Sequence, residues 1–219
     1  MRIMLAQKRV KVDAITTLAG DRLINTFSNI CVDNKVIQQN TACYLMLNKP
    51  VGVVSATKDD KHKTVLDLID HALKSQLHIV GRLDLNTSGL VLLTNDSRWS
   101  EALTSPQHKV QKHYQVTLQN SLNENFKAYQ AAFQQGMYFE FEDITTQPAT
   151  IELLSNHLAQ VTLTEGKYHQ IKRMFGRFRN PVMALHRSQI GEIMLDSQLK
   201  SGEWRILTSS EINSVCYNA

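Results

Sequence analysis

Short apolar runs divided by polar turns set the pattern of the chain. Residues 78–80 and 90–94 are two such runs, each with the length and composition of a buried strand, and the polar segment 81–89 lies between them. Residues 113–118 and 159–164 alternate polar and apolar side chains, which predicts two half-buried strands. The first expectation is therefore a polar loop held by strands on both sides.

Four segments carry helix signals. Thr64 is a candidate N-cap, and capping boxes at 121–124 and 208–211 would each open a helix. Another helix is expected after Tyr168, and Gly136 would end the helix that begins at 121–124. Three of these helices have apolar residues spaced to face the protein core. In the order of the helices after Thr64, at 121–124 and after Tyr168, they are Val65, Leu68, Ile69 and Ala72, then Leu122, Phe126, Tyr129 and Phe133, then Ile171, Met174, Phe175 and Phe178.

Residues 1–42 predict only short strands and turns. The segment 8–12 alternates as a half-buried strand does, and turns are expected at Gly20-Asp21 and Asp33-Asn34. Hairpin-like strands mixed with isolated helices indicate an α+β fold around a mixed, mostly antiparallel central sheet.

Composition narrows the class of protein. With 219 residues and 42% hydrophobic content, the chain can bury the core of one sizeable domain with a small appendage. It has no apolar run of membrane-spanning length and no signal-peptide pattern, so we expect a cytoplasmic protein without a membrane partner. A monomer is the default expectation.

The distribution of charge is more informative than its sum. The formal charge of +4 does not by itself argue for a nucleic-acid partner. The stretch 167–187, however, contains no acidic residue, which is typical of a surface that faces a polyanion. An ordinary solvated helix face is the alternative. The basic residues of this stretch are Lys167, Lys172, Arg173, Arg177, Arg179 and Arg187.

The polar segment 81–89 is the strongest candidate for chemistry. It holds one carboxylate, Asp84, with Arg82 two residues earlier, in a loop mounted between two strands. Rigid mounting favours a reactive group, because displacement by an ångström can reduce a rate by about two orders of magnitude. The alternative is that Asp84 caps its own turn and pairs with Arg82.

Several motifs in order along the chain resemble those of the RNA pseudouridine synthases, and more narrowly the RsuA-like branch that acts on ribosomal RNA. Gly-Arg-Leu-Asp at 81–84, followed by Thr-x-Gly-Leu-x-Leu-Leu-Thr-Asn-Asp at 87–96, resembles the segment that carries the catalytic aspartate. The segments 46–52, 104–118 and 165–175 resemble the family's first motif, its active-site tyrosine segment and its third motif. Together the matches cover about residues 44 to 212.

The resemblance implies a fold and a division into domains. The family has a mixed sheet in two halves with an RNA-binding cleft between them, which residues 43–219 are expected to form as the catalytic domain. Members of the branch usually begin with a small S4-type RNA-binding module. Residues 1–42 are expected to be a truncated S4-like segment whose two leading helices are missing.

The resemblance also assigns roles to residues in the cleft. Asp84 would be the catalytic residue, and Lys172 the cation that keeps its carboxylate ionised in a dry pocket. Tyr114 would stack on the target base, with movement of the C5 proton as a second role; plain core packing is the alternative. Arg82 would hold the flipped nucleotide or fill the space that it leaves, and Ile171 would form an apolar wall.

Other residues are expected at the edge of the site. Asn48 and Lys49 of the first motif would shape the cleft. Arg173 is expected to meet phosphate because it points about 100° away from Lys172 around the helix, and Arg177 and Arg179 belong to the same basic face.

The expected reaction is the isomerisation of a specific uridine in 16S small-subunit ribosomal RNA to pseudouridine. It needs no cofactor and no metal, and the spacing of His62, His71 and His78 matches no compact metal site. The alternatives are the same reaction on 23S large-subunit RNA and, in another class, a non-catalytic RNA-binding factor for ribosome assembly.

Overall fold

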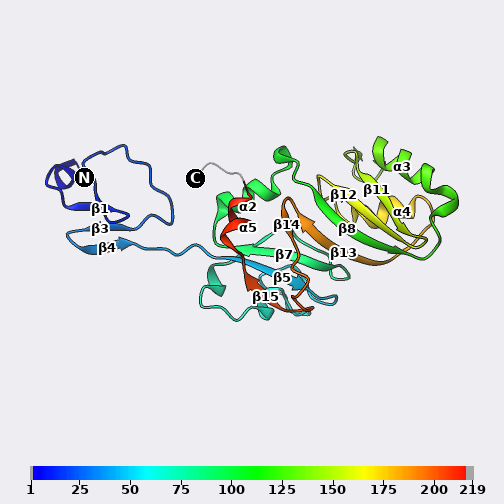
Figure 1. Ribbon diagram of the computed structural model, residues 1–219, viewed down its shortest axis with the longest axis horizontal. Helices are drawn as coiled ribbons and strands as arrows, with labels where there is room; N and C mark the ends of the chain where they lie inside the picture. The colour runs from blue at the N-terminus through cyan, green and yellow to red at the C-terminus, as the bar shows by residue number, and fades with distance from the viewer. Residues whose placement is uncertain (1, 216–219) are drawn as a thin grey trace. The chain divides into compact units, whose positions relative to one another are not determined.

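The computed structural model describes residues 2–215 (Figure 1). The chain forms two compact units, one that ends at Cys43 and one that begins at Tyr44. The sequence-based division placed this boundary between residues 42 and 43. Residues 1 and 216–219 of that division lie outside the described part.

The first unit is an antiparallel sheet in the order β2–β1–β3–β4. Its strands are β1 (Val10–Val12), β2 (Ile15–Thr16), β3 (Ile30–Val32) and β4 (Lys35–Gln38). Asp33 and Asn34 form the turn between β3 and β4 with left-handed φ angles of 52° and 62°. Asp and Asn tolerate this conformation in two-residue hairpins, and the turn predicted there is confirmed.

A short helix, α1 (Arg2–Ala6), precedes these strands. The expectation of strands and turns alone is therefore wrong for residues 2–6. Five residues are too few to show helical periodicity in a sequence, although Arg, Met, Leu and Ala are all strong helix formers.

The second unit is built on one large mixed sheet in the order β11–β12–β8–β13–β7–β5–β15, with β14 paired to β13 and β6 paired to β7. Among these pairs β7 and β13 run parallel and the others antiparallel. This confirms the predicted α+β class. The strands are β5 (Tyr44–Lys49), β6 (His78–Val80), β7 (Ser88–Thr94), β8 (Lys112–Leu118), β11 (Thr150–Ser155), β12 (Leu158–Leu163), β13 (Val182–Ile190), β14 (Ile193–Met194) and β15 (Trp204–Ile206).

The helices that pack on this sheet lie in two groups (Figure 1). They are α2 (Ser97–Thr104), α3 (Phe126–Gln135), α4 (Gln170–Gly176) and α5 (Ser209–Asn213). Helix α3 packs on β11, α4 on β13 and α2 on β6. Tyr129 and Phe133 of α3 contact Phe175 of α4, with ring centroids 5.7 and 5.1 Å apart, so aromatic packing fixes α4 in place.

The helix predicted after Thr64 is only a 3₁₀ turn, η1 (Leu66–Leu68). The Thr64 Oγ1 accepts a hydrogen bond from Asp67 N (3.2 Å), but Val65 occupies the cap position of this turn. Ile69 is already extended, with φ −94° and ψ 122°. The following Asp70 and His71 are weak helix formers, which explains why the apolar spacing does not continue as a helix.

The capping box predicted at 121–124 is also wrong. The Oγ of Ser121 accepts from Asn123 N (3.3 Å), a local turn contact, and a 3₁₀ turn, η4 (Asn123–Asn125), comes before α3. Gly136 does end α3, with φ 81°, as predicted. At the other end of the chain the capping box at 208–211 is confirmed, and it opens α5.

A small hairpin of β9 (Tyr138–Phe139) and β10 (Ile144–Thr145) follows α3. Two further 3₁₀ turns are η2 (Lys74–Gln76) and η3 (Pro106–His108). No helix within residues 2–215 is long and apolar enough to cross a bilayer.

Candidate active site

Residues 81–87, the Asp84 loop, connect β6 to β7 and are held by bonds to their backbone. The Ser55 hydroxyl accepts a hydrogen bond from Leu83 N (3.0 Å) and donates one to Leu83 O (2.9 Å). Thr87 N donates to the carbonyl of Asp84 (3.1 Å) and closes a turn. The backbone on both sides of the carboxylate is therefore fixed, as the sequence predicts for a loop mounted between strands.

Arg187 of β13 lies beneath this loop and is only 1% exposed. Its guanidinium donates to Leu90 O (2.8 Å), to Gly81 O (3.1 Å) and, at 3.5 Å, to Arg82 O. Its inclusion in a polyanion-facing surface is therefore wrong. The physical reason is that three backbone carbonyls replace water around the charge, so the side chain holds the loop instead of facing solvent.

Lys49, at the end of β5, supports the same loop from another side. Its side chain is fully buried (0% exposed), and its Nζ donates to Thr87 O (2.7 Å) and Pro50 O (2.8 Å). Burial lowers the pKa of Lys49 to about 8; the charge of Asp84 opposes this shift and that of Arg187 adds to it. The positive charge of Lys49 under the Asp84 loop is thus disfavoured by burial and by Arg187 and favoured by Asp84.

The other first-motif positions do not line the cavity in front of the Asp84 loop. Asn48 donates through Nδ2 to Leu199 O (2.8 Å), away from that cavity's lining residues. Gly52 N donates to Leu85 O (2.9 Å), so this motif contacts the Asp84 loop through its backbone.

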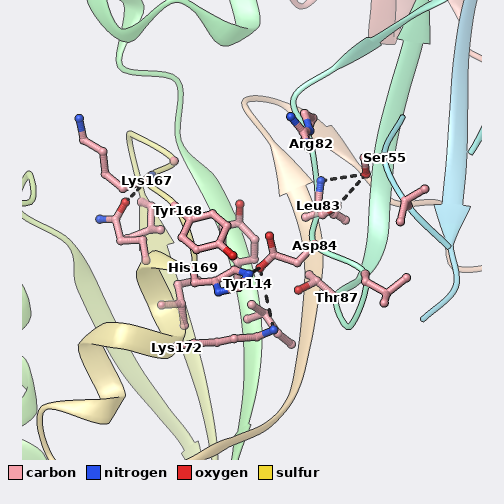
Figure 2. Close-up of a pocket in the computed structure, with 17 residues that line it drawn as sticks. Ser55, Arg82, Leu83, Asp84, Thr87, Tyr114, Lys167, Tyr168, His169 and Lys172 are labelled. Carbon is pink, nitrogen blue, oxygen red and sulfur yellow. Dashed lines mark hydrogen bonds and ion pairs between the residues drawn. The ribbon is translucent and has the colours of Figure 1, made fainter. Parts of the chain in front are cut away.

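A cavity of about 420 Å³ opens in front of the loop (Figure 2). Its walls come from the Asp84 loop, from β8 and from the start of α4, which are far apart in the sequence. The predicted site residues that line it are Arg82, Asp84, Tyr114, Ile171 and Lys172. A space of this size, closed on one side by a carboxylate, can hold a small polar molecule or one nucleotide.

Two side chains from the α4 segment meet the Asp84 carboxylate. Lys172 Nζ lies 3.9 Å from Asp84 Oδ2, and His169 Nε2 lies 3.5 Å from the same oxygen. The Lys172 ammonium can therefore offset the negative charge of the Asp84 carboxylate, as the resemblance implies for Asp84 and Lys172.

Tyr114 and Ile171 supply the apolar part of the cavity. Tyr114 is 8% exposed and Ile171 is buried, and both line the cavity. Arg82 is exposed, and Figure 2 shows its side chain directed away from Asp84. Within residues 2–215 Arg82 forms no ion pair with Asp84, so the alternative of a structural pair between them is not supported.

The three arginines of the basic face lie outside the cavity lining. Arg173 donates through both terminal nitrogens to Glu142 at 2.6 Å and sits 3.7 Å over the Phe139 ring. Its guanidinium is paired with Glu142 in this structure, and the phosphate contact expected of it stays a prediction. Arg177 is exposed and donates to Tyr138 O, and Arg179 is exposed with a left-handed φ of 53°.

His169 and Tyr168 were missed as site residues. Their rings stack with centroids 3.9 Å apart at the edge of the cavity. The only signal in the sequence was their place inside a motif, because residue spacing does not report a ring stack.

No three His, Cys, Asp or Glu side chains in the described part of the chain are grouped so as to hold a metal ion.

Comparison with known proteins agrees with this geometry. The family model of RNA pseudouridylate synthase matches residues 43–176. The ribosomal small subunit pseudouridine synthase A of Pseudomonas aeruginosa is 45% identical over 215 residues, which is 98% of this chain and 92% of the relative. The chain belongs to the RNA pseudouridine synthase family.

Further members support the assignment. The ribosomal small subunit pseudouridine synthase A of Escherichia coli is 42% identical over 208 residues, 94% of this chain and 89% of that protein. A solved structure described as a crystal structure of pseudouridylate synthase has a TM-score of 0.76 at 38% identity, and covers 98% of this chain and 92% of its own. This pseudouridine synthase is therefore similar to its relatives over nearly their full length.

Lys49 allows a prediction about the stability of this pseudouridine synthase. Its folded pKa of about 8 lies below the ordinary value of 10.5, so between these pH values the unfolded chain binds more protons and rising pH favours the fold. We expect the unfolding free energy of the wild type, minus that of Lys49→Met, to rise by about 2 kcal/mol from pH 7.5 to 10. Urea unfolding at several pH values measures this difference.

Lys127→Met, which removes an exposed lysine of α3, is the matched control and should show no such rise. A difference for Lys49→Met that stays constant with pH would mean that the lysine is not held in a dry environment.

Proposed function

We propose that this protein converts a uridine of 16S small-subunit ribosomal RNA into pseudouridine without a cofactor. The observation that carries the proposal is the Asp84 carboxylate, which faces a cavity from a fixed loop beside Lys172 and Tyr114. The choice of RNA is supported by the relatives, whose names specify the small ribosomal subunit.

The chemistry matches the few groups that the cavity offers. The N1–C1′ bond of uridine breaks, the uracil turns, and a C5–C1′ bond forms. The C5 hydrogen leaves as a proton and N1 gains one, so nothing is oxidised or reduced. Asp84 would act as an anion that attacks C1′ or the base, or that assists glycal formation at the ribose.

Tyr114 and Ile171 would keep the detached uracil in place. The base has no covalent link to the RNA backbone while it turns, so it must be enclosed. The Tyr114 ring offers a stacking surface and Ile171 an apolar wall, and the tyrosine hydroxyl forms no hydrogen bond within residues 2–215. That hydroxyl is the group we assign to movement of the C5 proton.

Arg82 would act before the chemistry. A stacked uridine must turn out of its helix to reach Asp84, which costs a few kcal/mol. Arg82 lies on the exposed side of the Asp84 loop and lines the cavity. From that position its guanidinium can contact the flipped nucleotide or occupy the space that the base has left.

We place the RNA-binding cleft along the Asp84 loop and β13. A second cavity of about 390 Å³ adjoins the first and shares Lys172 and Leu185 with it. Val51 and Met183 offer exposed apolar surface there, and Asn86 offers an amide. These groups suit a nucleotide next to the target uridine, with Lys172 between the two positions.

The exposed arginines after α4 would add phosphate contacts, which leads to a prediction. Each lost contact removes about 0.7 from the log–log slope of affinity against salt for single strands. We expect Arg177→Ala and Arg179→Ala to flatten that slope by about this amount each, as measured by filter binding over a range of salt concentrations.

Arg173→Ala is the comparison, since Glu142 already neutralises Arg173, and it should change the slope less. Equal slopes for the wild type and the Arg177/Arg179 variants would show that this face does not meet RNA.

The proposed activity can be tested with RNA that carries 5-tritiated uridine. Tritium leaves C5 only if the base is rejoined through that carbon. The protein is incubated with 16S and 23S RNA, each supplied free and as partly assembled particles, and release into water is counted. Release from 16S RNA alone is the expected result.

The other outcomes separate the alternatives. Release from 23S RNA alone would keep the reaction and overturn the target. No release from any substrate, with RNA binding intact, would favour the non-catalytic assembly factor.

We propose that the unit that ends at Cys43 is an S4-like module that contacts RNA through exposed Lys8, Lys11 and Lys35. We propose that the protein acts as a monomer. Ribosomal RNA as substrate supports work in the cytoplasm.

A further inference from the structure

The two partners of Asp84 contact the same atom. His169 Nε2 and Lys172 Nζ lie 3.5 and 3.9 Å from Oδ2. Within residues 2–215, no side chain or backbone group forms a hydrogen bond with Oδ1. Oδ2 is therefore the carboxylate oxygen that both groups approach most closely.

The position of His169 is set by its backbone and its neighbours. It directly precedes α4 and has left-handed angles, φ 49° and ψ 31°. Its carbonyl accepts from Arg173 N (3.0 Å), and its ring stacks on Tyr168 with an interplanar angle of 21°. Few non-glycine residues have positive φ, and such strain is often found at functional sites.

Hydrogen bonds also hold residues 165–167, which precede α4. Gln170 is buried; its Oε1 accepts from Lys167 N (3.0 Å) and its Nε2 donates to Glu165 Oε1 (2.8 Å). The imidazole is thus mounted on a fixed backbone. Lys172 differs, because an ammonium group on a four-carbon stem supplies charge without a fixed direction.

We propose that His169 is a positioning residue that holds Oδ2 of Asp84 and thereby directs Oδ1 at the substrate. This rests on the proposed function. The terminal torsion angle of an aspartate has a broad distribution. Without a rigid partner the carboxylate plane would therefore rotate, and Oδ1 would no longer point at the substrate. Lys172 balances the charge, and His169 fixes the orientation.

Two substitutions separate this role from others. Glutamine carries its amide nitrogen about as far from the backbone as Nε2, whereas asparagine reaches only about as far as Nδ1. Asparagine also tolerates positive φ better than glutamine does, so a loss with His169→Asn cannot come from backbone strain. We expect kcat to fall roughly 10- to 100-fold in His169→Asn, and His169→Gln to recover most of that loss.

The experiment measures kcat and KM by tritium release, RNA affinity by filter binding, and Tm for each variant. The expected result is a fall in kcat for His169→Asn with KM, RNA affinity and Tm near the wild-type values. Wild-type kcat in His169→Asn would overturn the inference, as would a change confined to KM. Equal losses in both variants would do so too, because they would indicate the stack with Tyr168 as the function.

The wild type and Asp84→Asn are measured in the same assay. An inactive wild type would mean that the proposed function has failed, independently of His169. An active wild type with no difference among the His169 variants would remove only the positioning role.

Discussion

Replacing Asp84 with asparagine is expected to reduce pseudouridine formation by at least about four orders of magnitude and to leave RNA affinity unchanged or slightly higher. Asparagine has nearly the same shape, and the hydrogen bond from Thr87 N goes to the backbone carbonyl at position 84, so the loop should keep its conformation. What is lost is the negative charge that faces the cavity. Single-turnover tritium release gives the rate, and filter binding gives the affinity.

Asp70→Asn is the matched control, since Asp70 is an exposed carboxylate outside the cavity. It should leave both the rate and the affinity unchanged. If Asp84→Asn kept more than about 1% of the wild-type rate, the carboxylate would not be the reactive group and the assignment of the site would have to be revised.

The largest effect on stability is expected for Gly89→Ala, at the start of β7. Gly89 has φ +106°, and a Cβ at this position would lie 2.3 Å from the backbone oxygen of Arg187. The parallel pair of β7 and β13 would have to separate at this point, so we expect a loss of more than about 3 kcal/mol in unfolding free energy. Urea unfolding followed by circular dichroism measures it.

Gly52→Ala gives the contribution of backbone strain alone. Gly52 also has positive φ (+84°), but nothing lies within 4 Å of the point that an added Cβ would occupy. The expected loss is about 1–2 kcal/mol. Similar losses for the two variants would show that β13 can move away from β7 without harm.

The residues around Asp84 could be predicted because each sits inside a contiguous motif. Asp84, Tyr114, Ile171 and Lys172 come from three motifs, and the structure places all of them around one cavity. Strand alternation was enough to show that Tyr114 is buried. Pairing partners were not readable from the sequence, because sheet order depends on contacts between distant segments.

The burial of Arg187 could not be predicted from the distribution of charge alone. It was grouped with exposed arginines because it shares their sign, yet it is buried beneath the Asp84 loop. Its alternation with Leu185 on β13 was a usable signal, since both side chains are buried on that strand. The contact with Asp84 made by His169 could not be found in this way, because it depends on a left-handed backbone that residue types do not report.

The hydrogen bonds from Arg187 to the Asp84 loop have a consequence for when the loop becomes fixed during synthesis of the chain. Arg187 follows Gly81, whose carbonyl it binds, by 106 residues. The segment that identifies the family ends at residue 176, before Arg187 is reached. A growing chain can therefore contain the whole segment that the family model matches and still have a loose Asp84 loop, so the protein should become competent for catalysis only after β13 has been synthesised and has paired with β7.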